Sequence, residues 1–168
     1  MFSNLRSLIF KLDPETAHNL AIKSLKFNFV PNILKREKNN SLFETKLFNR
    51  ELENPIGMAA GFDKNAEVYN SLFRLGFGFV EVGTITPLKQ YGNPKPRVFR
   101  LEEDEALINR LGFNNSGAEN IVYRIKSNKQ IGLLGVNIGP NKDSQNRLED
   151  YLKCLKTFHD VADYITIN

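Results

Sequence analysis

Four short apolar segments recur between residue 55 and residue 168, and helix-like segments separate them. The apolar segments have the length and composition of buried strands and lie at residues 55–61, 77–83, 133–139 and 163–168. The helix-like segments lie at residues 65–75, 116–127 and 146–160. Strands that alternate with helices form right-handed parallel βαβ units. The sequence therefore predicts an α/β fold built on a parallel sheet.

Two α/β architectures accommodate four parallel strands in a chain of 168 residues. One is a complete flavodoxin-like domain, and the other is the first half of a TIM (β/α)8 barrel. A barrel needs about 250 residues, so four of eight strands by residue 168 is the matching pace. The strand-like residues 163–168 also have nothing after them to cover them. Both observations favour the barrel, with the chain truncated after about its fourth strand.

Two short amphipathic helices are predicted before the barrel. Asp13-Pro14 ends the first and begins the second, because Asp is a good N-cap and Pro suits the first helical position. Each helix has an apolar stripe that a two-helix hairpin cannot bury by itself. On the second helix, one face carries Ala17, Leu20, Ala21, Ser24 and Leu25. On the last helix of the chain, one side carries Leu148, Leu152, Leu155, Phe158 and His159.

The polar residues 35–41 indicate a linker, which divides the chain into residues 1–40 and a barrel domain of residues 41–168. The barrel domain begins with a plausible short hairpin around Asn49-Arg50. The net charge of the chain is +4, and residues 1–40 account for all of it, with seven Lys or Arg and three acids. A basic amphipathic segment suggests an anionic surface, either a membrane or a nucleic acid, and a solvated helix face is the simpler alternative.

No apolar run approaches the roughly 20 residues that span a bilayer, so any membrane contact is expected to be peripheral. The single cysteine, Cys154, excludes an internal disulfide and reads as a small apolar residue on a helix. The two histidines lie far apart and no Cys/His cluster exists, so no metal site is predicted.

Small residues, amides and one lysine occupy the ends of the predicted strands, where parallel α/β folds place their sites. Glycine and alanine let backbone N–H groups approach the edge of a ring. Asparagine offers a donor and an acceptor together, which matches the O=C–N–H edge of a pyrimidine or an isoalloxazine. Lys64 would place positive charge where a reduced flavin becomes negative. Taken singly, each of these residues is more often structural: Asp63 as a helix cap, Lys64 as a solvated side chain, and Asn137 and Asn168 as strand ends. Their occurrence together at four strand ends favours a site.

The irregular residues 84–115 are the other functional signal, because connections of about 30 residues without dominant secondary structure are usually functional. Within them, the segment NRLGFNN at residues 109–115 combines a cation, three amides and a flexible glycine. Such a segment is suited to fold over an anionic, amide-rich ligand, and a plain surface turn is the alternative.

Six motifs, in this order and spacing, resemble the class 2 dihydroorotate dehydrogenases: GMAAGFDKN, VEVGTITP, NPKPRVFRL, INRLGFNN, VNIGPNKD and YITIN. The resemblance runs from about residue 2 to residue 168. DPETAH, at residues 13–18, resembles the N-terminal helices that distinguish class 2 from class 1.

The resemblance implies oxidation of dihydroorotate to orotate in pyrimidine biosynthesis, with hydride transfer to FMN and reoxidation by a quinone. It implies a peripheral membrane protein, on the cytoplasmic side of a bacterial inner membrane, with no nucleic-acid partner. The implied FMN contacts are Ala60, Gly61, Phe62, Asp63, Lys64, Thr84, Asn137 and Asn168. The implied substrate contacts are Lys64, Asn109, Arg110, Leu111, Gly112, Phe113 and Asn168. The implied quinone contacts are His18 and Arg100.

The chain departs from the family in one respect. The catalytic base of the family is a serine three residues beyond the position of Asn168, where this chain has ended. No catalytic residue is therefore expected within it, and these 168 residues are expected to be inactive alone, whether the sequence is incomplete or the gene is truncated. Two alternatives stay open: a related FMN barrel dehydrogenase with a soluble electron acceptor, and a non-catalytic truncated module.

Overall fold

A four-stranded parallel sheet is the centre of the computed structural model, which describes residues 9–27 and 41–168. Its strands are β3 (Gly57–Met58), β4 (Phe79–Ile85), β7 (Leu133–Ile138) and β8 (Tyr164–Ile167). They lie in the order β3-β4-β7-β8, so each new strand is added to the same edge of the sheet. A flavodoxin-like sheet reverses this direction at its switch point. The strand order therefore favours the barrel over the doubly wound alternative.

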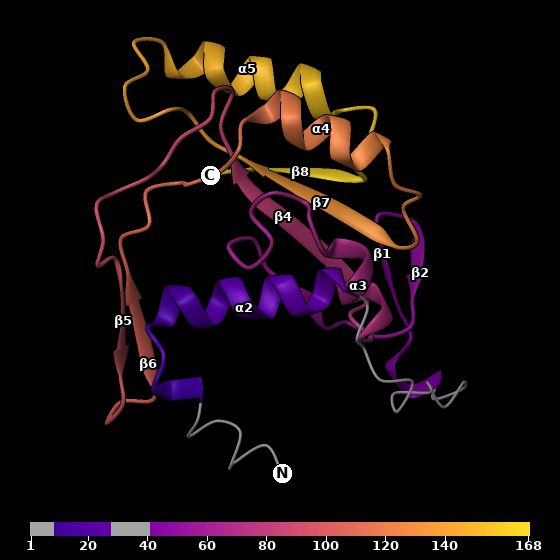
Figure 1. Ribbon diagram of the computed structural model, residues 1–168. Helices are drawn as coiled ribbons and strands as arrows, with labels where there is room; N and C mark the ends of the chain where they lie inside the picture. Colours follow the sequence, from indigo (N-terminus) through magenta and orange to yellow (C-terminus); the bar gives the residue numbers. More distant parts are fainter. Residues whose placement is uncertain (1–8, 28–40) are drawn as a thin grey trace.

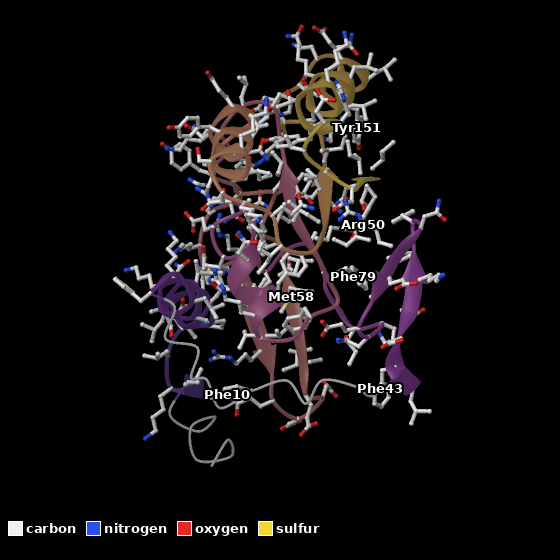
Figure 2. The ribbon with its side chains drawn as sticks, turned by 90° about the vertical axis from the view of Figure 1, so that its right-hand side faces the viewer. Phe10, Phe43, Arg50, Met58, Phe79 and Tyr151 are labelled. Carbon is white, nitrogen blue, oxygen red and sulfur yellow. The ribbon has the colours of Figure 1, made fainter. Side chains whose placement is uncertain are left out.

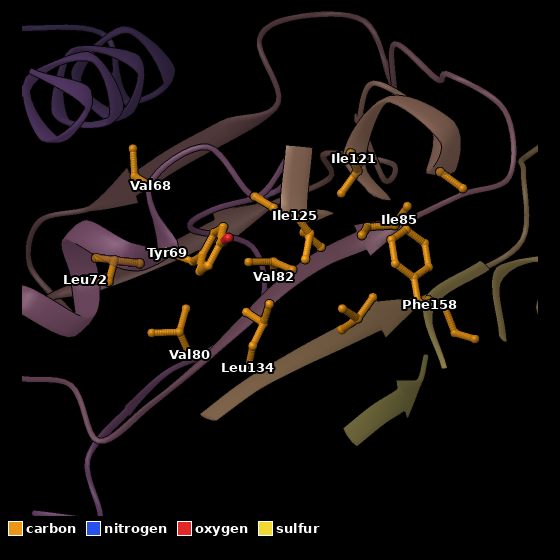
Figure 3. Packing of buried hydrophobic residues seen from close by; sticks show 14 of the residues in the cluster. Val68, Tyr69, Leu72, Val80, Val82, Ile85, Ile121, Ile125, Leu134 and Phe158 are labelled. Carbon is orange, nitrogen blue, oxygen red and sulfur yellow. The ribbon is translucent and has the colours of Figure 1, made fainter. Parts of the chain in front are cut away.

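Helices cover one face of the sheet, as Figure 1 shows for α4 and α5, which lie side by side. The three helices of the barrel part are α3 (Tyr69–Arg74), α4 (Ala118–Lys126) and α5 (Arg147–Phe158). Alternate side chains of each strand point toward these helices, because successive residues of a strand face opposite sides. The resulting core contains Val80, Val82, Leu134, Val136, Ile121, Ile125 and Phe158 (Figure 3). The intervening residues, Glu81 and Asn137 among them, point to the other face, which is the interior of the barrel.

The buried side of α5 differs from the apolar side predicted from its sequence. Phe158 and Cys154 are fully buried, whereas Leu148 is 69% exposed and Leu152 and Leu155 are also exposed. Positions 150, 154 and 158 recur every four residues and face the strands, so the leucines lie on the opposite side of the helix. The burial of Cys154 on α5 agrees with the prediction of a small apolar residue on a helix, and this burial raises the pKa of its thiol to about 12.

The N-terminal helix α2 (Pro14–Lys26) begins as predicted, with the Asp13 side chain accepting from Thr16 N at 2.9 Å. The side that packs on the barrel carries Ile22, which is 8% exposed, and the half-buried Glu15 and His18. Leu20, predicted to share the apolar face, is 56% exposed. The first predicted helix lies outside the described residues except for its last turn, and so does the predicted linker, except for its last residue. Within the described ranges, every helix is too short or too polar to traverse a bilayer.

A short hairpin of β1 (Thr45–Leu47) and β2 (Arg50–Leu52) covers the end of the sheet at which the strands begin. Its turn residues, Phe48 and Asn49, both adopt positive φ, one residue earlier than predicted. The ring of Phe48 lies 5.2 Å from that of Tyr164, and Arg50 pairs with Asp163 at 2.5 Å. Figure 2, in which Arg50 is labelled, shows the hairpin beside the strands. These contacts join it to the amino end of β8, away from the predicted site.

Residues 84–115 are more regular than predicted, and residues 65–75 are less regular. Residues 84–115 contain an antiparallel hairpin of β5 (Val98–Leu101) and β6 (Ala106–Asn109). These residues were predicted to be irregular, and the two strands form because each supplies the hydrogen-bonding partner of the other. The helix predicted over residues 65–75 is confined to α3, because turns occupy residues 61–68.

Candidate active site

Three polar side chains, Thr84, Asn137 and Asn168, meet at the carboxyl ends of β4, β7 and β8, and we call them the amide cluster. Thr84 Oγ1 donates to Asn137 Oδ1 at 2.7 Å. Asn168 Nδ2 donates to Thr84 Oγ1 at 2.8 Å and to Asn137 Oδ1 at 3.2 Å. Thr84 and Asn137 are buried, and Asn168 is exposed. The structure thus brings together three residues that were predicted, from separate strands, to contact the flavin.

The loop after β3, residues 59–65, folds back across the end of β4. Gly61 N donates to Gly83 O at 2.8 Å, and Gly83 N donates to Asp63 O at 3.1 Å. Gly61 has a φ of +106°, and nothing lies within 4 Å of where a Cβ would stand. The space beside its Cα is open, and its hydrogen-bonding partner Gly83 adjoins Thr84, so a flat ligand has room to approach the backbone there. Ala60 precedes it in the same loop and is half-buried.

Asp63 and Lys64, further along this loop, point in different directions. Asp63 is 1% exposed and accepts from Glu67 N at 2.8 Å and from Val68 N at 2.7 Å. It therefore holds the turn before α3 but does not cap that helix, whose N-cap residue is Val68 and has no side-chain cap hydrogen bond. Burial raises the pKa of Asp63, although these two backbone N–H groups oppose that shift. Lys64 turns the other way, and its Nζ donates to Gly61 O at 2.6 Å.

A cavity of about 760 Å³ separates α2 from the barrel and opens beside Lys64. The lining residues that matter here are His18, Ile22, Phe62, Lys64, Arg100 and Leu107. The rings of His18 and Phe62 meet edge to face at 5.3 Å. Burial, followed by the charge of Lys64, lowers the pKa of His18 and favours its neutral form. Burial also lowers the pKa of Lys64, while the carboxylate of Glu15 opposes that shift. The cavity thus combines apolar side chains with one histidine, two cations and several carboxylates, which are those of Glu15, Asp63, Glu67, Glu102 and Glu105.

Segment 109–115 borders this cavity, but only some of its predicted residues face it. Asn109 and Leu111 line the cavity. Arg110 instead turns onto the β5–β6 hairpin, where its Nη2 donates to Pro96 O at 3.0 Å. Gly112 and Phe113 adopt positive φ and shape the turn without lining the cavity. Asn114, which was not among the predicted contacts, lines the cavity, and its buried Oδ1 has no hydrogen-bond partner. An unpartnered buried acceptor of this kind is typical of a ligand site.

The Arg97 side chain, which sequence reasoning did not single out, holds α2 in place. It is 7% exposed and makes two hydrogen bonds to Glu15, at 2.5 Å to Oε1 and at 3.1 Å to Oε2. Its Nη1 donates to the carbonyl oxygens of Tyr91 and Asn93. No local pattern could reveal the pair, because 82 positions separate its members.

Arg100, predicted at a quinone site, lines the cavity and also joins the N-terminal segment to β5. Its Nη1 donates to Phe10 O at 3.1 Å and to Leu12 O at 2.7 Å. Its guanidinium lies 4.7 Å from the centre of the Phe10 ring. The guanidinium thus binds carbonyl oxygens just before Asp13. In the described part of the chain, no group of three His, Cys, Asp or Glu converges as metal ligands would.

Comparison with known proteins identifies relatives over almost the whole chain. A family model described as dihydroorotate dehydrogenase matches residues 42–168. A dihydroorotate dehydrogenase (quinone) from Bartonella henselae is 52% identical over 163 residues, which is 97% of this chain and 44% of the relative. The enzyme of the same name from Rhodopseudomonas palustris strain TIE-1 is 54% identical over 158 residues, covering 94% of this chain and 43% of the relative.

Solved structures give the same result. The dihydroorotate dehydrogenase of Eimeria tenella in complex with ferulenol superimposes with a TM-score of 0.85 at 41% identity. The match covers 93% of this chain and 43% of that one, and the ligand-free form gives the same TM-score. The prediction of a partial α/β barrel is thereby confirmed. The chain spans less than half the length of the relatives it matches.

Proposed function

The chain belongs to the dihydroorotate dehydrogenase family, and we propose that it forms the flavin-binding and quinone-binding part of an enzyme that oxidises dihydroorotate to orotate. The observation that carries this proposal is one continuous set of contacts. Lys64 Nζ binds Gly61 O, Gly61 N binds Gly83 O, and Gly83 adjoins Thr84 of the amide cluster. Consecutive contacts thus connect the Lys64 ammonium and Gly61 to the amide cluster at the carboxyl ends of the strands.

These residues fit FMN. The peptide of Gly61 leaves room for a flat ring, and the amide cluster offers donors and acceptors to the O=C–N–H edge of an isoalloxazine. Phe62 adds apolar surface, and Lys64 adds positive charge. Asp63 supports this loop from behind through its two backbone hydrogen bonds. When bound, the flavin would accept hydride from dihydroorotate and pass the electrons to a quinone.

We propose that the substrate lies between Lys64 and segment 109–115. Asn109 lines the cavity, and the unpartnered Asn114 Oδ1 is an acceptor suited to an N–H of the dihydroorotate ring. The ammonium of Lys64 suits the substrate carboxylate. Gly112 and Phe113 contribute through the shape of the turn, and Arg110 braces it from the side. Asn168, at the end of β8, does not line this cavity, and we propose that it contacts the substrate from its place in the amide cluster.

The acceptor is proposed to be a quinone that enters between α2 and the β5–β6 hairpin. The cavity there has apolar walls from Phe10, Ile22 and Leu107, which suit a lipophilic ring better than a soluble dinucleotide. His18 and Arg100 offer a neutral imidazole and a cation to its carbonyl oxygens. This lining is the observation that favours a quinone over a soluble acceptor.

We further propose that residues 1–40 form the segment that binds quinone and membrane, and that residues 41–168 form the flavin barrel. The surface of the N-terminal part supports peripheral membrane binding. Leu20 and Phe27 are 56% and 74% exposed, and Phe10 lies at the mouth of the cavity. Lys23, in the last turn of α2, would face anionic lipid headgroups such as those of a bacterial inner membrane, whereas Lys26 of the same turn pairs with Glu67 at 3.0 Å.

The test is to purify the protein at the full length that its gene encodes. The expected result is a yellow protein with a flavin absorbance band that forms orotate when supplied with dihydroorotate and a quinone. A colourless protein that binds no added FMN would overturn the flavin assignment. Activity with a soluble acceptor, but not with a quinone, would instead favour the related barrel dehydrogenases.

A further inference from the structure

Glu81 lies below the amide cluster, on the barrel-facing side of β4, and was not among the predicted site residues. Its Oε1 accepts from Asn137 Nδ2 at 2.9 Å, and its Oε2 accepts from Thr166 Oγ1 at 2.9 Å. One half-buried carboxylate thus joins three neighbouring strands, β4, β7 and β8. Tyr164 is a further neighbour of Glu81. Burial raises the pKa of Tyr164, and the charge of Glu81 and a hydrogen bond to it raise that pKa further.

The Glu81 carboxylate determines the direction of the hydrogen bonds within the amide cluster. An ionised carboxylate only accepts, so Asn137 must turn its NH2 group toward Glu81 and its Oδ1 toward the rim. Thr84 then donates its hydroxyl hydrogen to Asn137 Oδ1 and is left to accept from Asn168. Asn168 therefore commits its NH2 to the cluster, which leaves its Oδ1 to accept from a ligand.

We propose that Glu81 is a positioning residue that sets the hydrogen-bonding polarity of the amide cluster. Because an asparagine amide is nearly symmetric in shape, packing alone does not choose between its two orientations. With Glu81 in place, one arrangement satisfies all four groups. Without it, the amide of Asn137 can rotate and present its NH2 to the rim, and the cluster no longer matches one defined ring edge. The consequence for FMN rests on the proposed function, whereas the polarity of the cluster does not.

A purely structural role is the competing explanation, since the same carboxylate also ties β4 to β8 through Thr166. The two roles separate by substitution. Glu81→Gln keeps the size of the side chain but introduces a donor, so Asn137 is no longer forced to turn its NH2 group toward position 81. Thr166→Val removes the tie to β8 and leaves the bond between Glu81 and Asn137 intact. Glu81→Asp keeps the charge on a shorter side chain and is the conservative variant.

The experiment uses the protein at its full encoded length, with asparagine labelled with ¹⁵N, and records the side-chain amide resonances before and after addition of FMN. We expect Glu81→Gln to shift or double the amide signals of both Asn137 and Asn168, and Thr166→Val to leave those of Asn168 in place. In a flavin fluorescence titration, Glu81→Gln should weaken FMN binding on the order of tenfold, as loss of one charge-assisted hydrogen bond would. Thr166→Val should stay within about twofold of wild type.

The outcomes decide the two proposals separately. Unchanged Asn168 signals in Glu81→Gln, or equal effects of Glu81→Gln and Thr166→Val, would overturn the positioning role. If the wild-type protein binds no FMN while the amide signals respond as expected, the flavin assignment fails and the role of Glu81 stands. If circular dichroism shows that Glu81→Gln does not fold, Glu81→Ala takes its place, and Glu81→Asp, which retains the carboxylate, should keep the wild-type amide signals. Wild-type amide signals in a folded Glu81→Ala variant, together with wild-type FMN affinity, would also contradict the role.

Discussion

Glu15 and Arg97 form a two-point ion pair between α2 and the segment that precedes β5, with the shorter bond at 2.5 Å. Both side chains are largely shielded, at 13% and 7% exposure, and Lys95 lies 3.4 Å from the same carboxylate. Arg97 also donates to the backbone carbonyl oxygens of Tyr91 and Asn93. Its hydrogen bonds therefore form one junction between α2 and the segment before β5. This junction sets the distance between α2 and the barrel, and with it the width of the cavity.

Replacing Arg97 by alanine should detach α2 from the barrel. Removing Arg97 leaves the shielded Glu15 carboxylate with only the exposed Lys95 as a partner, and the cost is at most about 3–5 kcal/mol. We expect faster proteolysis near residues 9–27 and a lower thermal midpoint, measured by limited proteolysis and circular dichroism. Arg110→Ala, which removes an exposed guanidinium from the neighbouring hairpin, is the control. Equal protease resistance in Arg97→Ala and the wild type would show that the pair does not hold the helix.

Acid should loosen the same helix in two steps. The pKa of His18 is lowered from its ordinary 6.5 by burial, so its protonation opposes docking as the pH falls below 6.5. The pKa of Glu15 is lowered from 4.5 by its bond to Arg97, so that contribution is present above 4.5 and is lost as the pH falls further. Hydrogen exchange of α2, followed from pH 7 to well below pH 4, would measure both steps. His18→Gln should abolish only the first, and a helix equally protected across this range would contradict the assignment.

Lys64→Ala should lower flavin occupancy or the rate of orotate formation in the full-length protein. The reason is the position of its ammonium between the cavity and the peptide of Gly61. Loss of one favourable charge at a shielded site typically lowers a rate by about tenfold or more. Lys89→Ala, at an exposed lysine near Tyr91, is the matched control. If both variants retain wild-type flavin content and turnover, Lys64 plays no part in the site.

Deletion of residues 1–40 should abolish turnover with quinone and membrane association while flavin stays bound. The deletion removes His18 and one wall of the cavity, but it leaves the amide cluster and the loop at residues 59–65 intact. Liposome flotation at low and high salt measures the membrane term, because attraction of lysines to anionic lipids is screened by salt. Unchanged flotation of the truncated protein would refute this role.

Expressed as 168 residues, the chain should associate instead of behaving as a well-folded monomer. Within residues 9–27 and 41–168, strand β8 pairs only with β7, and Ile167 on it is 72% exposed. Leu148, Leu152 and Leu155 form an exposed apolar stripe on the neighbouring helix. Unpaired strand edges and apolar stripes of this kind promote association. A sharp monomer peak in size-exclusion chromatography, with cooperative unfolding, would show that the sheet is stable with this edge open.

Local patterns in the sequence were enough to predict the alternating strands and helices, the Asp13 cap and the residues at the strand ends. These features depend on the period of a single segment or on one turn, so neighbouring residues determine them. The meeting of Thr84, Asn137 and Asn168 was also foreseeable, because parallel strands end at one edge of the sheet.

Pairs that are distant in the sequence were decided only by the tertiary structure. Glu15 finds Arg97 across 82 positions, and Glu81 finds Thr166 across 85, and no periodicity carries that information. The same holds for β6, which needs β5 as its partner, and for Leu20 and Leu148, whose exposure depends on which side of each helix meets the barrel. Burial and pairing are properties of surfaces brought together by folding, and a sequence pattern specifies the faces available without specifying which one is covered.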